Sequence, residues 1–151
     1  MELKNFFLVI FLVSFFNSVN AEMVKPAENL SAYEVLKIQL NALKNNDDED
    51  NGIRQTWLFA HPENKKMTGP YPRFRNMLYD VHYRILLNHY SHKIDLIMNT
   101  DNKFVYGVKV LSDDKKQFFY LWHVEKGKDQ NCSDCWFTSG VSMPKDQGNS
   151  I

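Results

Sequence analysis

The sequence predicts an α+β domain in which helices come first and an antiparallel sheet follows. Between residues 32 and 43, apolar side chains recur every three to four positions, a spacing typical of a helix that buries one face. From Val81 onward the apolar spacing changes to two, which is typical of strands. Helical segments followed by an antiparallel meander define the α+β class. We therefore expect the N-terminal helices to pack on an antiparallel sheet.

The first half of the chain is expected to hold three helices. Ser31 and Glu34 stand three residues apart at the start of the first helix, the capping-box arrangement. The run "NNDDEDNG", residues 45–52, ends this helix because Asn, Asp and Gly favour turns. Pro62 is expected to end the second helix. The other elements predicted here are short helices within residues 50–62 and 71–81 and a Gly/Pro-rich link over 63–72.

The second half is expected to form the sheet. The run "KFVYGVKVL" alternates strictly, and "QFFYLWHVEK" is a long aromatic strand pattern. The runs predicted as strands are residues 81–87, 92–100, 103–111, 117–126 and 135–143. The polar residues 144–151 are interpreted as a tail.

The first 21 residues are expected to be a cleaved secretory signal. Lys4 precedes the apolar stretch "FFLVIFLVSFF", which is shorter than the roughly 20 residues that span a bilayer. Val19 and Ala21 supply the small side chains that signal peptidase needs; an uncleaved anchor is the alternative. The sequence therefore predicts a periplasmic or secreted protein. It would consist of an extended leader, a single domain and the polar tail, over residues 22–30, 31–143 and 144–151.

The charges of the chain are balanced, with 18 Lys and Arg residues against 18 Asp and Glu residues. Removal of the signal takes away Lys4 and Glu2, so the balance persists after cleavage. Without a basic excess, the protein has no electrostatic attraction for a nucleic-acid backbone or an anionic membrane surface. Neither nucleic acid nor, after cleavage, a membrane is expected as a partner.

Two cysteines, Cys132 and Cys135, stand in a C-x-x-C spacing between two strand patterns. A redox centre would need them at the start of a helix, where the dipole lowers the thiol pKa. Asp129 and Asp134 would instead raise that pKa. In an oxidising compartment we expect a structural disulfide at the tip of a hairpin, with a redox role, free thiols or a metal site as alternatives.

Several short motifs, in their order along the chain, resemble the domain of unknown function 4864. They run from about Ala32 to Met143 and include Trp136, Gly140 and Val141 in the last strand. The other matching positions are Gln39, Leu40, Ala42, Leu43, Phe59, Ala60, Pro62, Gly69, Pro70, Phe74 and Met77. The C-x-x-C departs from the family, which has a Gly-containing turn at that place.

This family is similar to the nuclear transport factor 2-like, or cystatin-like, fold. The resemblance implies a strongly curved sheet that wraps a long helix and leaves a concave pocket. It implies a scaffold rather than a reaction, since the family has no established activity and the fold hosts isomerases, dehydratases and plain binding modules.

Candidate polar site residues are few. For metal, His89 and His92 are the best pair, with His82 nearby. Residues three apart on a strand point to opposite faces, so this pair cannot chelate without a turn between them. For acid–base catalysis the candidates are Asp80, His82, Tyr83, Asp95 and His123. Alternation places Asp95 beside Lys93 on a solvent-facing side. No phosphate loop, nucleophile elbow or zincin motif occurs, so no catalytic residue, metal or cofactor is assigned.

Aromatic and aliphatic side chains are the remaining candidates, because concave ligand sites are mostly apolar. The residues predicted to line the pocket are Trp57, Phe74, Met77, Tyr83, Tyr106 and Trp122. We expect a non-catalytic module of the cell envelope that binds an apolar small molecule or has a structural role. An isomerase or dehydratase-like enzyme is the alternative, which requires an ionisable group in the pocket. Homodimerisation through the sheet face is expected if Phe118 and Tyr120, or Phe119 and Leu121, are exposed.

Overall fold

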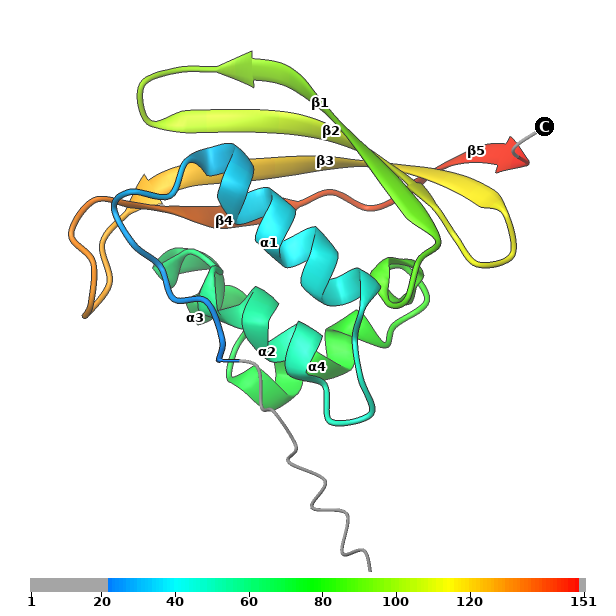
Figure 1. Cartoon of the computed structure of the whole chain (residues 1–151), viewed down its shortest axis with the longest axis horizontal. Helices are drawn as coiled ribbons and strands as arrows, with labels where there is room; N and C mark the ends of the chain where they lie inside the picture. The colour runs from blue at the N-terminus through cyan, green and yellow to red at the C-terminus, as the bar shows by residue number, and fades with distance from the viewer. Residues whose placement is uncertain (1–21, 150–151) are drawn as a thin grey trace, which may run out of the picture.

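A computed structural model describes residues 22–149 and contains an α+β domain. Its helices pack on one side of a curved antiparallel sheet, as predicted (Figure 1). The helices are α1 (Ala32–Lys44), α2 (Asn51–Leu58), α3 (Pro62–Thr68), α4 (Tyr71–Leu78) and the short 3-10 helix η1 (Arg84–Leu86). The strands are β1 (Ser91–Asn99), β2 (Lys103–Leu111), β3 (Lys116–Gly127), β4 (Cys135–Val141) and β5 (Lys145–Asn149).

The sheet has the order β1-β2-β3-β4, and every neighbouring pair is antiparallel. Its pairing shifts register in β1 between Leu96 and Met98 and in β3 between His123 and Val124. Such bulges bend and twist the strands that contain them, which accounts for part of the curvature seen in Figure 1. The concave face of the sheet therefore wraps around α1.

Helix α1 supplies the centre of the core. The predicted capping box is confirmed: the Ser31 hydroxyl accepts from the Glu34 backbone N–H at 3.2 Å, and the Glu34 carboxylate accepts from the Ser31 N–H at 2.7 Å. The apolar stripe of the helix is fully buried against β3, β4 and α2. The residues it buries are Ala32, Val35, Leu36, Leu40 and Leu43.

The predicted link over 63–72 is wrong in its first half, because residues 62–68 form α3. Pro62 begins this helix instead of ending the previous one, which stops at Leu58. Proline suits the first helical turn, where its missing N–H would have no partner and its fixed φ is already helical. His61 precedes it and caps the helix, with Nδ1 accepting from the Glu63 N–H at 3.2 Å.

The predicted strand over 81–87 is also wrong. These residues form turns and η1, with the Asp80 carbonyl accepting from the N–H groups of Tyr83 and Arg84 at 3.1 and 2.9 Å. The Asp80 carboxylate also accepts from the His82 N–H at 3.3 Å, a local bond that favours a turn. Period-two pairing begins only at Ser91.

The C-terminal residues described as a polar tail contain a strand. Residues 145–149 form β5, which pairs with the first part of β3, between Lys116 and Phe119. All five residues of β5 are exposed, so they lack the apolar alternation that marks a strand in the sequence. Backbone hydrogen bonding alone places this segment.

The N-terminal leader is extended and fastened to α2. The side-chain amide of Gln55 holds the backbone of Val24 from both sides, accepting from its N–H and donating to its carbonyl at 2.8 Å each. The predicted signal, residues 1–21, lies outside the described residues. Within residues 22–149, no helix is long and apolar enough to cross a membrane.

Candidate functional site

A cavity of about 230 Å³ lies between the helices and the concave face of β3 and β4. All four α-helices contribute to its wall, together with the segment around η1. Most of the wall is apolar, formed chiefly by Leu43, Phe74, Met77, Leu78, Leu86 and Trp122. Its polar side chains include Gln39, Thr56, Asn64, Thr68, Tyr83 and Thr138.

The structure brings four of the six predicted pocket residues together and leaves two outside. Phe74, Met77, Tyr83 and Trp122 line the cavity. Trp57 lies behind Phe74, with the two ring centroids 4.9 Å apart. Tyr106 points from β2 toward Tyr33 of α1 and stacks on Phe104, at centroid distances of 6.3 and 5.9 Å. The alternation of side chains along a strand predicts which face of the sheet a residue lies on. It does not predict which part of that face the helices leave uncovered.

The buried polar side chains of the cavity were missed in the sequence. Gln39 is 1% exposed and lies on the apolar stripe of α1, three and four residues after Leu36 and Val35. A polar side chain at such a position needs a buried partner. Its partner comes from β4, where Thr138 is 4% exposed. The polar interruption of the stripe was the available signal, but the partner was not visible without the fold.

The parallel contact between Ala60 and Thr138 fixes the edge of the cavity. The Thr138 N–H donates to the Phe59 carbonyl at 2.7 Å, and the Thr138 carbonyl accepts from the His61 N–H at 2.8 Å. The α2–α3 connection therefore extends the sheet beside β4. This pairing holds α3 in place as part of the cavity wall.

Tyr83 is the only ionisable side chain in the cavity wall formed by residues 22–149. Burial, with a smaller contribution from the charge of Asp80, raises the pKa of its hydroxyl. The hydroxyl donates to the Val141 carbonyl at 3.2 Å. A phenol in this state keeps its proton at neutral pH and has already donated it to the backbone.

The other acid–base candidates lie away from the cavity. Asp80 and His82 are exposed, and Asp95 is half-buried on β1, where its carboxylate lies 3.4 Å from the Lys93 ammonium, as predicted. His123 lies next to Trp122 on β3 and so points to the opposite face of the sheet. Burial and the charge of Lys103 lower its pKa.

The side chains of His89 and His92 meet, because the two residues do not lie on one continuous strand. His89 lies before β1, after Asn88 with its φ of 54°, so a turn precedes the strand and the two rings meet. His89 Nε2 lies 2.7 Å from His92 Nδ1, and His89 Nδ1 lies 2.7 Å from the Leu86 carbonyl. Burial lowers the pKa of His89 to about 4, so His89 is neutral at pH 7, and burial also lowers the pKa of His92. Among the described residues, no group of three or more metal-binding side chains can hold an ion.

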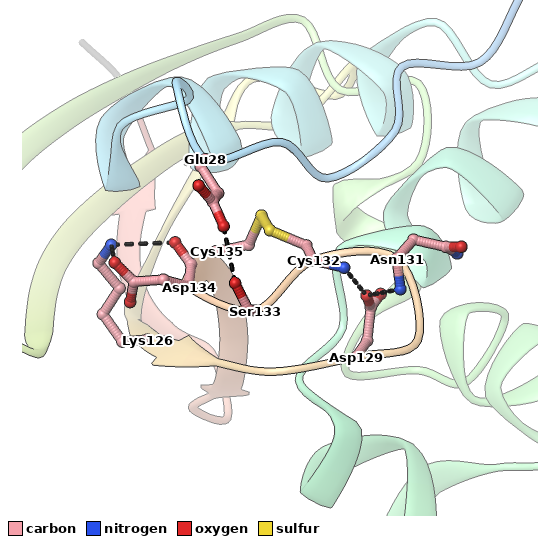
Figure 2. Close-up of a disulfide and its surroundings, with 8 residues drawn as sticks. All are labelled: Glu28, Lys126, Asp129, Asn131, Cys132, Ser133, Asp134 and Cys135. Atoms are coloured by element: carbon pink, nitrogen blue, oxygen red, sulfur yellow. Dashed lines mark hydrogen bonds and ion pairs between the residues drawn. A yellow bond between two sulfur atoms is a disulfide. The ribbon is translucent and has the colours of Figure 1, made fainter.

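Cys132 and Cys135 form a disulfide that closes the turn between β3 and β4 (Figure 2). Their Cα atoms are 5.9 Å apart, and both side chains are buried with Phe137. The Asp129 carboxylate accepts from the Cys132 N–H at 2.8 Å, and Ser133 donates to Glu28 of the leader at 2.8 Å. These bonds tie the turn and the leader together. The disulfide lies outside the cavity.

The convex face of the sheet carries a partly exposed apolar patch. Ile97 and Met98 are 58% and 50% exposed on the edge strand β1, and Phe119 and Leu121 are half-buried on β3. Tyr120, by contrast, is fully buried on the concave face. Homodimerisation through the convex face stays a prediction.

Tyr71 offers a test of polar burial near the cavity. Its hydroxyl is buried and has no hydrogen-bond partner within residues 22–149. Because an unpaired buried hydroxyl costs about 1–3 kcal/mol, Tyr71→Phe is expected to raise the free energy of unfolding by about 1 kcal/mol in urea denaturation. The matched control is Tyr120→Phe, which removes a donor bonded to the His82 carbonyl at 3.0 Å and should lower that energy by about 1 kcal/mol. Equal losses in both variants would mean that the Tyr71 hydroxyl has a partner.

Comparisons with protein-family models, with curated proteins and with solved structures found no match to this chain.

Proposed function

We propose that this chain is an exported domain of the nuclear transport factor 2-like type that binds a small uncharged molecule without transforming it. The observation that carries the proposal is the cavity, whose described wall is mostly apolar and holds a single ionisable side chain, Tyr83. At about 230 Å³ it exceeds the roughly 150 Å³ of an engineered apolar cavity that binds benzene. A ligand of about one substituted ring fits this space.

The enzyme alternative has weaker support. Isomerases and dehydratases need a positioned acid or base with a pKa tuned toward the working pH. Tyr83 donates to the Val141 carbonyl, and the shift of its pKa is upward, away from neutrality. A tyrosine in this state serves binding better than proton transfer.

Export and the nuclear transport factor 2-like assignment belong to the same proposal. The disulfide between Cys132 and Cys135 supports an oxidising location such as the periplasm or the cell exterior. The wrapping of the curved sheet around α1 supports the fold assignment (Figure 1). We propose a role in the cell envelope on these grounds.

Met77 provides a direct test of binding in the cavity. It lies on α4, and its half-buried side chain belongs to the cavity wall. Met77→Trp should therefore fill part of the cavity, because the indole is larger than the flexible methionine side chain. We expect toluene to raise the melting temperature of the wild-type mature chain, because a ligand that binds only the folded state stabilises it.

The tryptophan variant should weaken toluene binding at least tenfold, as measured by the melting temperature across a toluene titration. Met77→Leu is the control, since leucine has a similar volume, leaves the cavity free and should change the affinity less than threefold. The melting temperature without toluene checks that both variants fold. Equal toluene binding by the tryptophan variant would place the ligand elsewhere, and no stabilisation of the wild type would remove the proposal.

A further inference from the structure

The polar side chains of the cavity form a deep layer and an outer layer. In the deep layer, Gln39, Thr56 and Thr138 are each no more than 5% exposed. In the outer layer, Asn64, Thr68 and Tyr83 are half-buried. A ligand can form hydrogen bonds only with polar atoms that the protein has left available, so the state of each layer determines the ligand chemistry.

The hydroxyl and indole protons of the deep layer are already donated within the protein. The Trp122 indole N–H donates to Thr138 at 2.9 Å, and the Thr138 hydroxyl donates to the Gln39 side-chain carbonyl. The Gln39 amide donates to the Thr56 carbonyl at 3.0 Å, and the Thr56 hydroxyl donates to the Gly52 carbonyl at 2.9 Å. The hydroxyl and indole hydrogens of this layer are therefore not available to a ligand.

In the outer layer, the hydroxyls of Tyr83 and Thr68 donate hydrogen bonds within residues 22–149 but accept none from them. The Tyr83 hydroxyl donates to the Val141 carbonyl at 3.2 Å, and the Thr68 hydroxyl donates to the Asn64 carbonyl at 2.9 Å. Each hydroxyl has one hydrogen, and in both cases a main-chain carbonyl takes it. No donor in the described part of the chain approaches either oxygen. Both oxygens, on residues that line the cavity, therefore have lone pairs available and no proton to give.

The same wall disfavours charge on the ligand. No lysine, arginine or histidine of residues 22–149 lines it, so a carboxylate or phosphate would be buried without a cation. No aspartate or glutamate of that range lines it either, so an ammonium group would be buried without an anion. Burying an unpaired charge costs far more than burying a neutral polar group.

We infer that the ligand is a neutral, ring-sized molecule that carries a hydroxyl group, and that the Tyr83 oxygen accepts the hydrogen bond from it. The inference rests on the proposed function and adds the ligand class. Tyr83 is chosen over Thr68 because its hydroxyl lies against the Val141 carbonyl of β4, whereas Thr68 follows Met67, a residue of the wall that is 75% exposed. Exclusion of water at this place strengthens a hydrogen bond.

The test compares phenol, toluene and benzoate on the wild-type mature chain and on Tyr83→Phe, with dissociation constants from calorimetry at pH 7. Phenol and toluene have similar size, but only phenol carries a hydroxyl. Tyr83→Phe should weaken phenol binding roughly two- to tenfold and leave toluene within twofold, because one net hydrogen bond is lost. Benzoate should bind the wild type at least tenfold more weakly than phenol.

The outcomes separate this inference from the proposal beneath it. If toluene and phenol both bind and Tyr83→Phe changes them equally, the hydroxyl inference is overturned and the binding function stands. If Thr68→Val, and not Tyr83→Phe, weakens phenol selectively, the assignment of Tyr83 is overturned. If benzoate binds more tightly than phenol, the ligand is not neutral. If none of the three binds, the proposed function fails together with its ligand class.

Discussion

Replacing Asp50 by alanine is expected to lower the free energy of unfolding by about 2–4 kcal/mol. Asp50 joins α1, α2 and α4, and its side chain is only 4% exposed. Its carboxylate accepts from the Asn46 amide at 3.0 Å, from the Arg75 guanidinium and from the Tyr79 hydroxyl. Hydrogen bonds to a charged group contribute about 1.5–3 kcal/mol each. The expected loss is below their sum because Arg75 and Tyr79 are partly exposed and regain water.

Two further variants separate charge from shape at this position. Asp50 has a φ of 60°, a left-handed conformation that asparagine tolerates well and that alanine does not. Asp50→Asn keeps this tolerance and removes only the charge, so it should cost about 1–2 kcal/mol. Asp48→Ala removes an exposed carboxylate of the same acidic run and should change stability by less than about 0.5 kcal/mol. Equal effects of Asp48→Ala and Asp50→Ala in urea denaturation would contradict a structural role for Asp50.

The contribution of Asp50 should disappear in acid. Burial raises its pKa, but the hydrogen bonds from Tyr79, Asn46 and Arg75 outweigh burial and hold the pKa below its ordinary value. A carboxyl group with a lowered folded-state pKa stabilises the fold fully above its unfolded pKa of about 4, and this stabilisation is lost as pH falls through the folded value. The difference in unfolding free energy between wild type and Asp50→Asn should therefore be constant from pH 5 to 8 and shrink below about pH 4. Protonation of the buried His89 in acid also changes stability, because its pKa is lowered to about 4. Both proteins contain His89, so the difference between them cancels this change.

The parts of the fold that the sequence predicted are those where local pattern and tertiary packing agree. Ser31 and Glu34 satisfy each other within one helical turn, so the start of α1 was readable without any long-range contact. Strands β2 and β3 bury alternate side chains on the concave face, and in β2 that alternation is present in the sequence. In these segments the spacing of apolar residues in the sequence is enough to predict which side chains the fold buries.

The elements that were wrong depend on contacts that the period does not record. Residues 81–87 have a strand-like spacing, but the chain must turn there to pass from α4 to β1, and the Asp80 backbone and side chain favour that turn. Strand β5 is held by its backbone on β3 and has no buried side chain. Pro62 was predicted to end the preceding helix, but it is the first residue of α3, where a proline favours the start of a helix.

The cavity was predictable in composition but not in outline. Phe74, Met77, Tyr83 and Trp122 were identified because aromatic and aliphatic side chains line most ligand sites. The polar pairing between Gln39 and Thr138 spans 99 positions and depends on the placement of α1 against β4. A single sequence has no local signal for a contact at that separation.

Gln39→Leu is expected to lower the free energy of unfolding by about 2–4 kcal/mol, although leucine has nearly the same size. The change removes the bond to the Thr56 carbonyl and leaves the Thr138 hydroxyl without its acceptor inside a buried network. Lost bonds cost about 0.5–1.5 kcal/mol each, and an unpaired buried hydroxyl about 1–3 kcal/mol. Asn41→Leu is the control, because it makes the same kind of change on the exposed side of α1 and should shift stability by less than about 0.5 kcal/mol.

The network also predicts that the two ends of this hydrogen bond are energetically coupled. Thr138→Val removes the hydroxyl that Gln39→Leu leaves unpaired, so the double variant should be more stable than the sum of the single losses by about 0.5–3 kcal/mol. Trp122 supplies an independent readout, since its indole N–H donates to Thr138 and should change its fluorescence when that acceptor is lost. Strict additivity with unchanged tryptophan emission would mean that the deep layer is not a connected network. In that case the polar wall of the cavity would not be closed to a ligand, and hydrogen bonding at Gln39 would compete with the acceptor assigned to Tyr83.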